Sequence, residues 1–405
     1  MGDAMRRTGA ALLAALGLQL AAGWAGQAEA ANPIKLALVQ GTSGATLEVY
    51  SRQSQVGFKL GLEYATQGTM EVLGRKIEVI ARDTQFKADV ARAALAEVFA
   101  DPDVVFAVGD TASGVAKAML PIAAEAKKIL IVEPAVADSL TGADWNRYIF
   151  KTSRNSSMDM QAQALALRPN KDLSVATLAE DYAFGKDGVA AFKETLQGTG
   201  ATIVHEEYVP LQATDLTAPL NRIFEKLKDR PGRKVLLVYL ASVPNALGKI
   251  KDQQPERFGI ELSTGGNILP ALATYKAVPG MEGAVYYYYE APKNSVNDWL
   301  VKEHMKRFSE PPDFFTAGGF AAAMAAVTAL KTAGSTDTEK LIAAMEGMAF
   351  DTPKGRMVFR KEDHQALQSM YHFKIRVDPN VKWAIPDLVR EIKPEEMKIP
   401  IRNTR

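Results

Sequence analysis

The sequence predicts an α/β protein of two doubly wound lobes, in which parallel strands alternate with helices. Short apolar runs such as 104–108 and 129–132 are rich in β-branched residues and too short for helices. Such runs are typical of strands buried on both faces of a parallel sheet. Segments with helical spacing follow these runs almost without interruption. The same alternation restarts after the polar segment 153–157, which favours two similar lobes over one very large sheet.

The chain begins with a segment that is typical of a cleaved export signal. Arg6 and Arg7 precede the apolar stretch 8–26, and Ala28-Glu29-Ala30 then offers small residues at the positions that a signal peptidase reads. A membrane anchor is the alternative, but the apolar run is short for a bilayer. We therefore predict that residues 1–30 are a signal peptide and that the mature protein is periplasmic.

Strands and helices are expected along the whole mature chain. The predicted strands are 34–39, 75–81, 104–108, 129–132, 148–152, 173–178, 202–208, 234–240, 261–263, 283–289, 355–359 and 371–377. The predicted helices are 51–66, 87–99, 114–126, 186–197, 215–228, 245–253, 296–308, 316–333 and 338–348. The apolar helix 316–333 is interrupted by Gly318-Gly319 and carries Lys331, so we expect it in the core of the protein.

Composition and missing motifs argue against several classes of protein. The chain has no cysteine, hence no disulfide framework and no thiolate nucleophile. Its 48 Lys and Arg balance 47 Asp and Glu without a long basic run, which argues against a nucleic-acid partner. It lacks a Walker loop, a dinucleotide-binding glycine motif and a nucleophile elbow, and its four histidines lack metal-ligand spacing. We expect no metal, no cofactor and no enzyme activity.

Small polar residues follow the strand 104–108 at the point where a helix begins. The strand ends at Gly109-Asp110, and Thr111 and Ser113 come directly before a segment with helical spacing. In an open parallel sheet, ligands bind at this edge, where hydroxyls and free backbone N–H groups point outward. The alternative is that Asp110 or Ser113 only caps the helix.

Three stretches of the mature chain, taken in their order along the sequence, carry a resemblance to known proteins. They are IKLALVQGTSGATLEVYSRQSQVGFKLGLEYA, VFAVGDTASGVAKAMLPIAAEAKKILIVEPAVADSLT and LAEDYAFGKDG. The first is similar to the first strand, loop and helix of the periplasmic substrate-binding proteins of ABC importers, of the leucine/isoleucine/valine-binding type. The second resembles the two ligand-loop strands of that family, and the third resembles the pattern that opens its second lobe. The resemblance covers roughly residues 32–377.

The resemblance implies the periplasmic binding protein type I fold, with two lobes that close around a ligand about three hinge strands. The hinge crossings are expected near Thr152-Ser153, near Tyr286-Tyr287 and within 350–354. Lobe 1 would then comprise residues 31–152 and 287–353, and lobe 2 residues 153–286 and 354–405. The implied partners are a small-molecule ligand, a membrane permease and its ATPase, and the receptor itself would be a monomer.

The resemblance also assigns ligand-binding roles to individual residues. Tyr50 and Phe184 align with aromatics that cover the ligand from lobe 1 and lobe 2, although a half-exposed tyrosine and a core phenylalanine are the simpler alternatives. Ser113, supported by Thr111, aligns with the serine that holds a ligand carboxylate, and two alanines align with positions that offer backbone groups. The full predicted set is Tyr50, Thr111, Ser113, Ala135, Ala137, Phe184, Ser242, Gly266 and Tyr289.

The sequence departs from the amino-acid binders of this family where those proteins bind the ligand ammonium. Segment 264–267 reads Thr-Gly-Gly-Asn and has no carboxylate, and Ala241-Ser242-Val243 replaces a tyrosine-rich loop. A buried ammonium without a counter-charge costs several kcal/mol. The aromatic run 286–289 offers rings for stacking. We therefore expect a small carboxylate with an apolar or aromatic body, such as a benzoate- or cinnamate-like acid.

Other functions stay open at this point. Asp110, Asp181 or Glu133 would supply the missing negative charge in a rearranged cleft. A branched-chain or other amino acid is therefore the second ligand class, followed by amides or urea. Further alternatives are a binding protein that signals through a partner kinase, and a periplasmic enzyme that uses Asp110 or Asp181 as general base.

Overall fold

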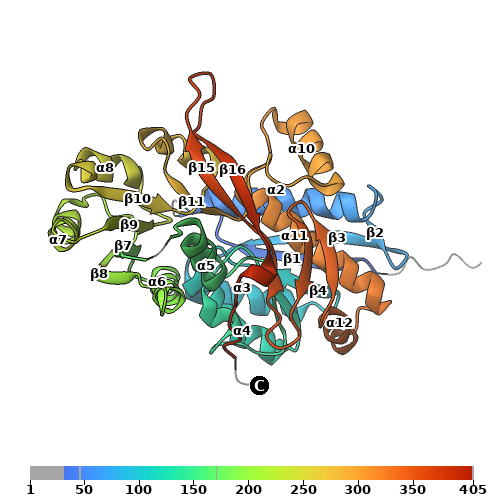
Figure 1. Cartoon of the computed structure of the whole chain (residues 1–405). Helices are drawn as coiled ribbons and strands as arrows, with labels where there is room; N and C mark the ends of the chain where they lie inside the picture. Colours follow the sequence, from blue (N-terminus) through green and yellow to red (C-terminus); the bar gives the residue numbers. More distant parts are fainter. Residues whose placement is uncertain (1–31, 45–46, 170, 404–405) are drawn as a thin grey trace, which may run out of the picture. The chain divides into compact units, whose positions relative to one another are not determined.

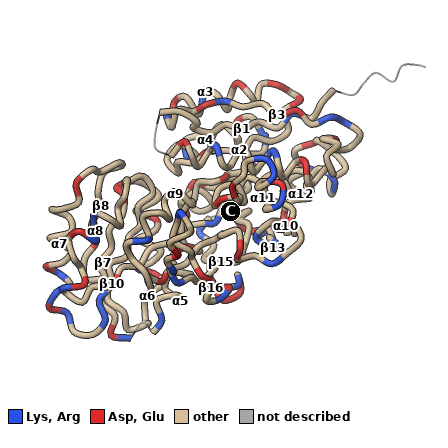
Figure 2. Tube along the Cα trace, turned by 90° about the horizontal axis from the view of Figure 1, so that it is seen from above, with Lys and Arg blue, Asp and Glu red and all other residues tan. Residues whose placement is uncertain are grey.

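The computed structural model describes residues 32–44, 47–169 and 171–403, and those from Pro33 onward form one unit. The predicted signal peptide lies outside the described residues. Two parallel sheets and two small antiparallel sheets make up the unit (Figure 1). Basic and acidic residues are interspersed along the trace, in line with the balanced charge of the sequence (Figure 2).

The first parallel sheet, called sheet 1 below, is built from the first part of the chain in the strand order β2-β3-β1-β4-β5-β6. Every pairing in it is parallel except that of the short strand β2 with β3. The predicted parallel order is thereby confirmed. Its strands are β1 (Ile34–Gln40), β2 (Glu71–Val72), β3 (Arg75–Asp83), β4 (Val104–Val108), β5 (Ile129–Val132) and β6 (Ile149–Lys151).

Helices cover both faces of sheet 1 because its central strands β1, β4 and β5 are apolar on both faces. In β1, Leu36 and Leu38 pack into one hydrophobic cluster, and Ala37 and Val39 pack into another. This alternation is the two-residue period of a strand. The first cluster contains side chains of α2 (Glu48–Ala65), α11 (Phe314–Ala333) and α12 (Thr338–Met345). The second contains side chains of α3 (Ala88–Ala100) and α4 (Ser113–Ala126).

The second parallel sheet, sheet 2, has the strand order β10-β9-β7-β8, and all its pairings are parallel. Its central strand β7 is buried along its whole length. Successive residues of β7 again point into separate clusters on the two faces. The strands are β7 (Leu173–Glu180), β8 (Thr202–Val209), β9 (Arg233–Tyr239) and β10 (Ile260–Thr264), and the helices are α5 (Ser156–Ala166), α6 (Ala183–Leu196), α7 (Thr217–Leu227), α8 (Ala246–Asp252) and α9 (Leu269–Leu272).

The last part of the chain adds two antiparallel sheets and differs most from the prediction. The predicted strand 283–289 ends at Val285, and the tyrosines 286–289 lie outside any strand. A strand that the sequence did not predict, β16, follows β15. The elements are β11 (Glu282–Val285) with β15 (Met370–Arg376) and β16 (Ile385–Ile392), then β12 (Ala349–Thr352) with β13 (Gly355–Phe359) and β14 (Ala366–Leu367), and the helix α10 (Ser295–Phe308).

Glycines allow an unusually close approach of α2 and α11. A Cβ atom on Gly319 would lie 1.9 Å from the backbone oxygen of Ser54, and one on Gly57 would lie 1.9 Å from the oxygen of Thr316. Neither position tolerates a side chain without separating the helices. Although α11 is long and apolar enough to cross a membrane, most of it is buried against α2 and sheet 1. The prediction of a core helix is confirmed.

Replacing Gly319 by alanine is expected to lower the free energy of unfolding by about 1–3 kcal/mol, because the added methyl group overpacks the α2–α11 contact. Urea unfolding followed by circular dichroism measures this change. Gly114→Ala is the matched control, since a Cβ there meets no atom within 4 Å. It should leave stability unchanged or raise it by up to about 1 kcal/mol. Equal losses in both variants would contradict the packing argument.

Candidate functional site

A cavity lies where the carboxyl ends of strands from both parallel sheets come together. Residues that follow β4 and β5 line it from sheet 1, and residues that follow β7, β9 and β10 line it from sheet 2. Open α/β sheets bind ligands at this edge, because helix N-termini and loop backbone groups are concentrated there. The lining residues at or just beyond these strand ends are Thr111, Ser113, Pro134, Val136, Tyr182, Phe184, Leu240, Ala241, Thr264, Gly265, Gly266 and Asn267.

Aromatic side chains make up a large part of the cavity wall. Phe184 stacks on Tyr239 with ring centroids 4.1 Å apart and planes 17° apart. Tyr50 packs on Phe315 at 4.5 Å, and Tyr286 meets Phe314 edge-on at 4.0 Å. Stacked and edge-on contacts of this kind are the arrangements in which aromatic rings attract each other. The aromatic residues in the lining are Tyr50, Tyr182, Phe184, Tyr239, Tyr275, Tyr286, Phe314 and Phe315.

Hydrogen bonds fix several of these rings in place. The Tyr50 hydroxyl donates to the backbone oxygen of Ala241 at 2.9 Å, so that α2 is joined to the loop after β9. The Tyr275 hydroxyl donates to the oxygen of Gly265 at 2.8 Å. Burial raises the pKa of Tyr50 to about 12, which keeps this hydroxyl protonated and a donor at neutral pH. The wall is therefore preorganised rather than loosely packed.

An arginine–aspartate pair forms the charged part of the wall. The Arg154 Nε donates to Asp159 Oδ1 at 2.7 Å, and the Tyr239 hydroxyl donates to Asp159 Oδ2 at 3.0 Å. The Arg154 guanidinium carbon lies 4.7 Å from the ring centroid of Tyr286 and 5.0 Å from that of Phe314. Among the described residues that line the cavity, Arg154 is the only one with a positive charge and Asp159 the only one with a carboxylate.

Part of the predicted set lies in this cavity. Tyr50, Thr111, Ser113, Phe184 and Gly266 line it. Thr111 and Ser113 come from the loop and helix start after β4. Their hydroxyls are already engaged, since the Thr111 oxygen lies 2.5 Å from that of Ser51. The Ser113 Oγ accepts hydrogen bonds from the backbone N–H groups of Val136 and Ala137 at 3.3 and 3.2 Å.

The other predicted residues lie outside the lining. Ala135 and Ala137 are buried, and the Ala135 N–H donates to the Asp110 backbone oxygen at 3.1 Å. Ser242 is buried against Glu180, whose carboxylate accepts its N–H at 2.7 Å. Tyr289 packs on Tyr288, with ring centroids 4.8 Å apart. Of the tyrosines in the run 286–289, Tyr286 is the one that lines the cavity.

Neither candidate general base lines the cavity. Asp110 is fully buried and accepts hydrogen bonds from the Gly41 N–H at 2.9 Å and the Thr84 hydroxyl at 2.7 Å. Asp181 is exposed and forms an ion pair with Lys186 at 2.9 Å. The described residues include no group of His, Cys, Asp and Glu side chains that could hold a metal ion.

The sequence-based prediction missed Arg154, Asp159 and several aromatics. Arg154 lies in a polar segment between β6 and α5, and nothing in its neighbourhood distinguishes it from a solvated arginine. Its position becomes informative only when Tyr286 and Phe314, which are distant in sequence, lie beside it. The one local signal is the spacing of Arg154 and Asp159, which form an ion pair across the start of α5.

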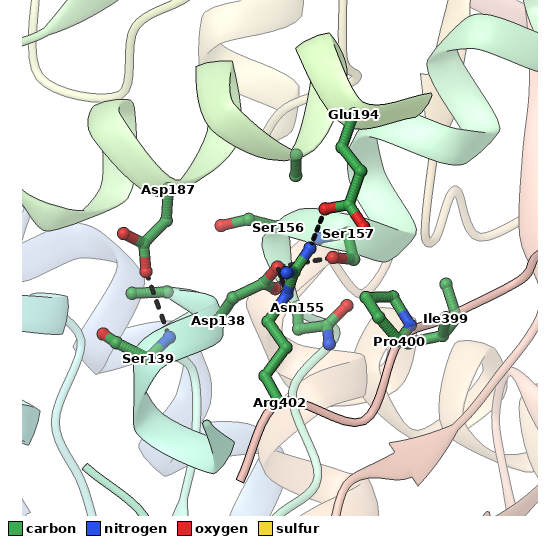
Figure 3. A network of polar contacts seen from close by, with 12 residues as sticks. Asp138, Ser139, Asn155, Ser156, Ser157, Asp187, Glu194, Ile399, Pro400 and Arg402 are labelled. Atoms are coloured by element: carbon green, nitrogen blue, oxygen red, sulfur yellow. Dashed lines mark hydrogen bonds and ion pairs between the residues drawn. The ribbon is translucent and has the colours of Figure 1, made fainter. Parts of the chain in front are cut away.

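A network of polar contacts joins the turn after β5 to α6 (Figure 3). The Ser139 N–H donates to Asp187 Oδ2 of α6 at 3.1 Å. The Arg402 guanidinium contacts Glu194 of α6 and donates through Nε to Asp138 Oδ2 at 3.3 Å. The C-terminal segment therefore takes part in joining the turn after β5 to α6.

Comparisons with known proteins place this geometry in a family. The family model for periplasmic binding proteins matches residues 33–380. The chain belongs to the periplasmic binding protein family. This confirms the predicted family and the type I fold.

Three proteins described below are similar to this chain over most of their own length. An ABC-type branched-chain amino acid transporter protein from Rhodopseudomonas palustris is 62% identical, with 92% of this chain and 100% of that chain covered and a TM-score of 0.83. A solute-binding protein of an ABC transporter from R. palustris BisB5, in complex with 3,4-dihydroxybenzoic acid, is 26% identical over 90% and 98% of the chains, with a TM-score of 0.77. A leucine-, isoleucine-, valine-, threonine- and alanine-binding protein from Pseudomonas aeruginosa is 25% identical over 84% and 88%.

Acidification is expected to stabilise the wild type relative to the variant Asp110→Asn. Burial raises the pKa of Asp110 to about 6, above the value of about 4 in an unfolded chain. The folded protein therefore binds a proton between about pH 6 and 4 that the unfolded chain does not. The contribution of Asp110 to the free energy of unfolding grows as the pH falls through 6.

Urea unfolding of both proteins at several values between pH 7 and pH 4.5 measures this difference. The wild type should gain about 2 kcal/mol relative to the variant across that interval. The altered hydrogen bonding of the asparagine is present at every pH and does not affect the slope. A difference that is constant with pH would contradict the assignment of a raised pKa to Asp110.

Proposed function

We propose that the protein is the solute receptor of an ABC importer and that its solute is a small aromatic carboxylate. The observation that carries the ligand class is the composition of the cavity wall, which combines aromatic side chains of α2, α11, α6 and β9 with a single arginine. Such a wall suits a ligand with a planar apolar body and one negative charge. The membrane permease and ATPase are the proposed partners, and the proposed receptor is an exported monomer.

The aromatic wall favours an aromatic body over a branched aliphatic one. Ring pairs in offset or edge-on contact gain about 0.5–1.5 kcal/mol beyond the burial of their surface. A benzoate-sized ring against Phe184 and Tyr239 would extend the existing stack. The 3,4-dihydroxybenzoic acid complex of the R. palustris BisB5 protein supports this ligand class.

A branched-chain amino acid is the second candidate, because the names of the R. palustris and P. aeruginosa relatives include this class. Its ammonium group would need a negatively charged hydrogen-bond acceptor in the wall. Asp159 is the lining carboxylate, and both of its oxygens already accept hydrogen bonds, from Arg154 and Tyr239. The segment 264–267 offers no carboxylate, as the sequence indicated. The cavity therefore favours the aromatic acid.

The proposed lobes each contain one parallel sheet and are joined at three crossings. The first crossing, near Thr152-Ser153, lies between β6 of sheet 1 and β7 of sheet 2. The second, near Tyr286-Tyr287, lies between β11 and the helices α10 and α11. Hydrophobic packing supports a third crossing later than the predicted 350–354. Side chains up to Ala366 pack in the α2–α11 cluster of sheet 1, and those from Met370 onward pack in the cluster that contains residues of sheet 2.

Aromatic acids are expected to raise the melting temperature of the purified mature protein, whereas leucine, isoleucine and valine are not. A ligand at a hundredfold excess over its Kd stabilises the folded state by about 2.7 kcal/mol. A thermal-shift screen should include benzoate, 4-hydroxybenzoate, 3,4-dihydroxybenzoate and cinnamate beside the amino acids. A shift with leucine or valine but with none of the acids would make the branched-chain amino acid the solute.

A bound aromatic acid is also expected to make the protein more compact. The contact of Tyr50 with Ala241 joins two sides of the cavity wall, and that of Ser139 with Asp187 joins the turn after β5 to α6. Opening of the lobes would break these contacts, and ligand that touches both lobes favours the closed state. Small-angle X-ray scattering should show a smaller radius of gyration with ligand. Identical profiles would mean that the cavity binds without hinge closure.

A further inference from the structure

We infer that Arg154 binds the carboxylate group of the solute, in place of the serine and backbone groups that the family resemblance assigns to this task. The inference rests on the proposed function, because it concerns how the aromatic acid is held. It makes Arg154 the residue that distinguishes an acid from a neutral analogue of the same shape.

Several donors of the predicted carboxylate site are already engaged within the protein. The backbone N–H groups of Val136 and Ala137 donate to the Ser113 Oγ, and that of Ala135 donates to the backbone of Asp110. The Thr111 hydroxyl is paired with Ser51. A carboxylate that used these three backbone N–H groups would have to displace hydrogen bonds that the protein already makes.

Arg154, by contrast, has unused donors at the cavity wall. A guanidinium carries five N–H donors in a planar fork that matches a carboxylate. Its Nε is used by Asp159, whereas its two terminal nitrogens donate to no hydrogen bond within the described part of the chain. The side chain is 11% exposed, and it lines the cavity. These terminal nitrogens are the charged donors that the cavity offers to a ligand.

The surroundings of Arg154 hold the guanidinium in a fixed orientation. Asp159 binds its Nε, and the rings of Tyr286 and Phe314 lie beside it at 4.7 and 5.0 Å from the guanidinium carbon. Asp159 also binds Tyr239, which stacks on Phe184. A ring lying against the Phe184–Tyr239 stack would therefore lie on the side of the wall where Asp159 joins this stack to Arg154.

The charge of the pair sets the class of ligand. Arg154 and Asp159 together carry no net charge. The carboxylate of a bound ligand would therefore place a single negative charge beside the Arg154 cation. A second carboxylate would find no further cation among the described lining residues. An aromatic dicarboxylate is therefore disfavoured, and the preferred solute is an aromatic monocarboxylate.

The test compares an acid with its amide. The affinities of 3,4-dihydroxybenzoate and 3,4-dihydroxybenzamide, measured by isothermal titration calorimetry, give an acid-to-amide preference for each protein. We expect a strong preference for the acid in the wild type and a fall of this preference by about 30-fold or more in Arg154→Gln. Arg154→Lys, which keeps the charge but not the fork, should retain part of it.

Two further variants keep the result interpretable. Arg154→Gln with Asp159→Asn removes the charge without leaving an unpaired buried carboxylate, so it should keep a melting temperature near that of the wild type and still lose the preference. Arg222→Gln is the matched control, because this exposed arginine of α7 pairs with Glu207 on the surface. It should bind both probes as the wild type does.

The outcomes separate the inference from the proposed function. A wild type that binds neither probe nor the other aromatic acids of the screen would overturn the proposed function and the inference together. A wild type that binds the acid, with a double variant that keeps the acid-to-amide preference, would overturn the inference alone. Loss of the preference in Ser113→Ala, but not in the Arg154 variants, would return the carboxylate to the serine loop.

Discussion

A buried carboxylate, that of Asp110, holds together the edge of sheet 1 on which the cavity is built. Its side chain accepts hydrogen bonds from the Gly41 N–H after β1, from the Thr84 hydroxyl after β3 and from the Ala112 N–H before α4. Its backbone oxygen accepts the N–H of Ala135 after β5. One residue thus connects the ends of neighbouring strands. Burial disfavours the charge and raises the pKa of Asp110, and these hydrogen bonds offset part of that cost while they fix the loops.

Sheet 2 also has a buried carboxylate at its edge that accepts hydrogen bonds from loop N–H groups. Glu180 ends β7, is buried, and accepts hydrogen bonds from the Ser242 N–H at 2.7 Å and the Ala241 N–H at 3.2 Å. Ala241 in turn receives the Tyr50 hydroxyl from α2. The loop after β9 is therefore held by the Glu180 carboxylate of sheet 2 and by the Tyr50 hydroxyl of α2. Ser242 supports the wall without being part of it.

The sequence was sufficient for the fold because the central strands of the parallel sheets, such as β1, β4 and β7, are apolar on both faces, a pattern that depends only on local residues. It also pointed to Tyr50 and Phe184, through their place in family motifs. Arg154 could not be recognised, because its environment is made by Tyr286 and Phe314 from distant parts of the chain. The strand β16 was missed because buried and exposed residues do not alternate regularly along it.

The contact between Ser139 and Asp187 has a practical consequence in a chain that contains no cysteine. A cysteine introduced at Asp187 would be the only thiol in the protein, so a fluorescent dye could be attached there without protecting any native residue. The dye would sit on α6 beside the turn after β5, where its surroundings change if these elements separate. The receptor would then report the concentration of its solute as an optical signal, without a coupled enzyme or a radioactive ligand.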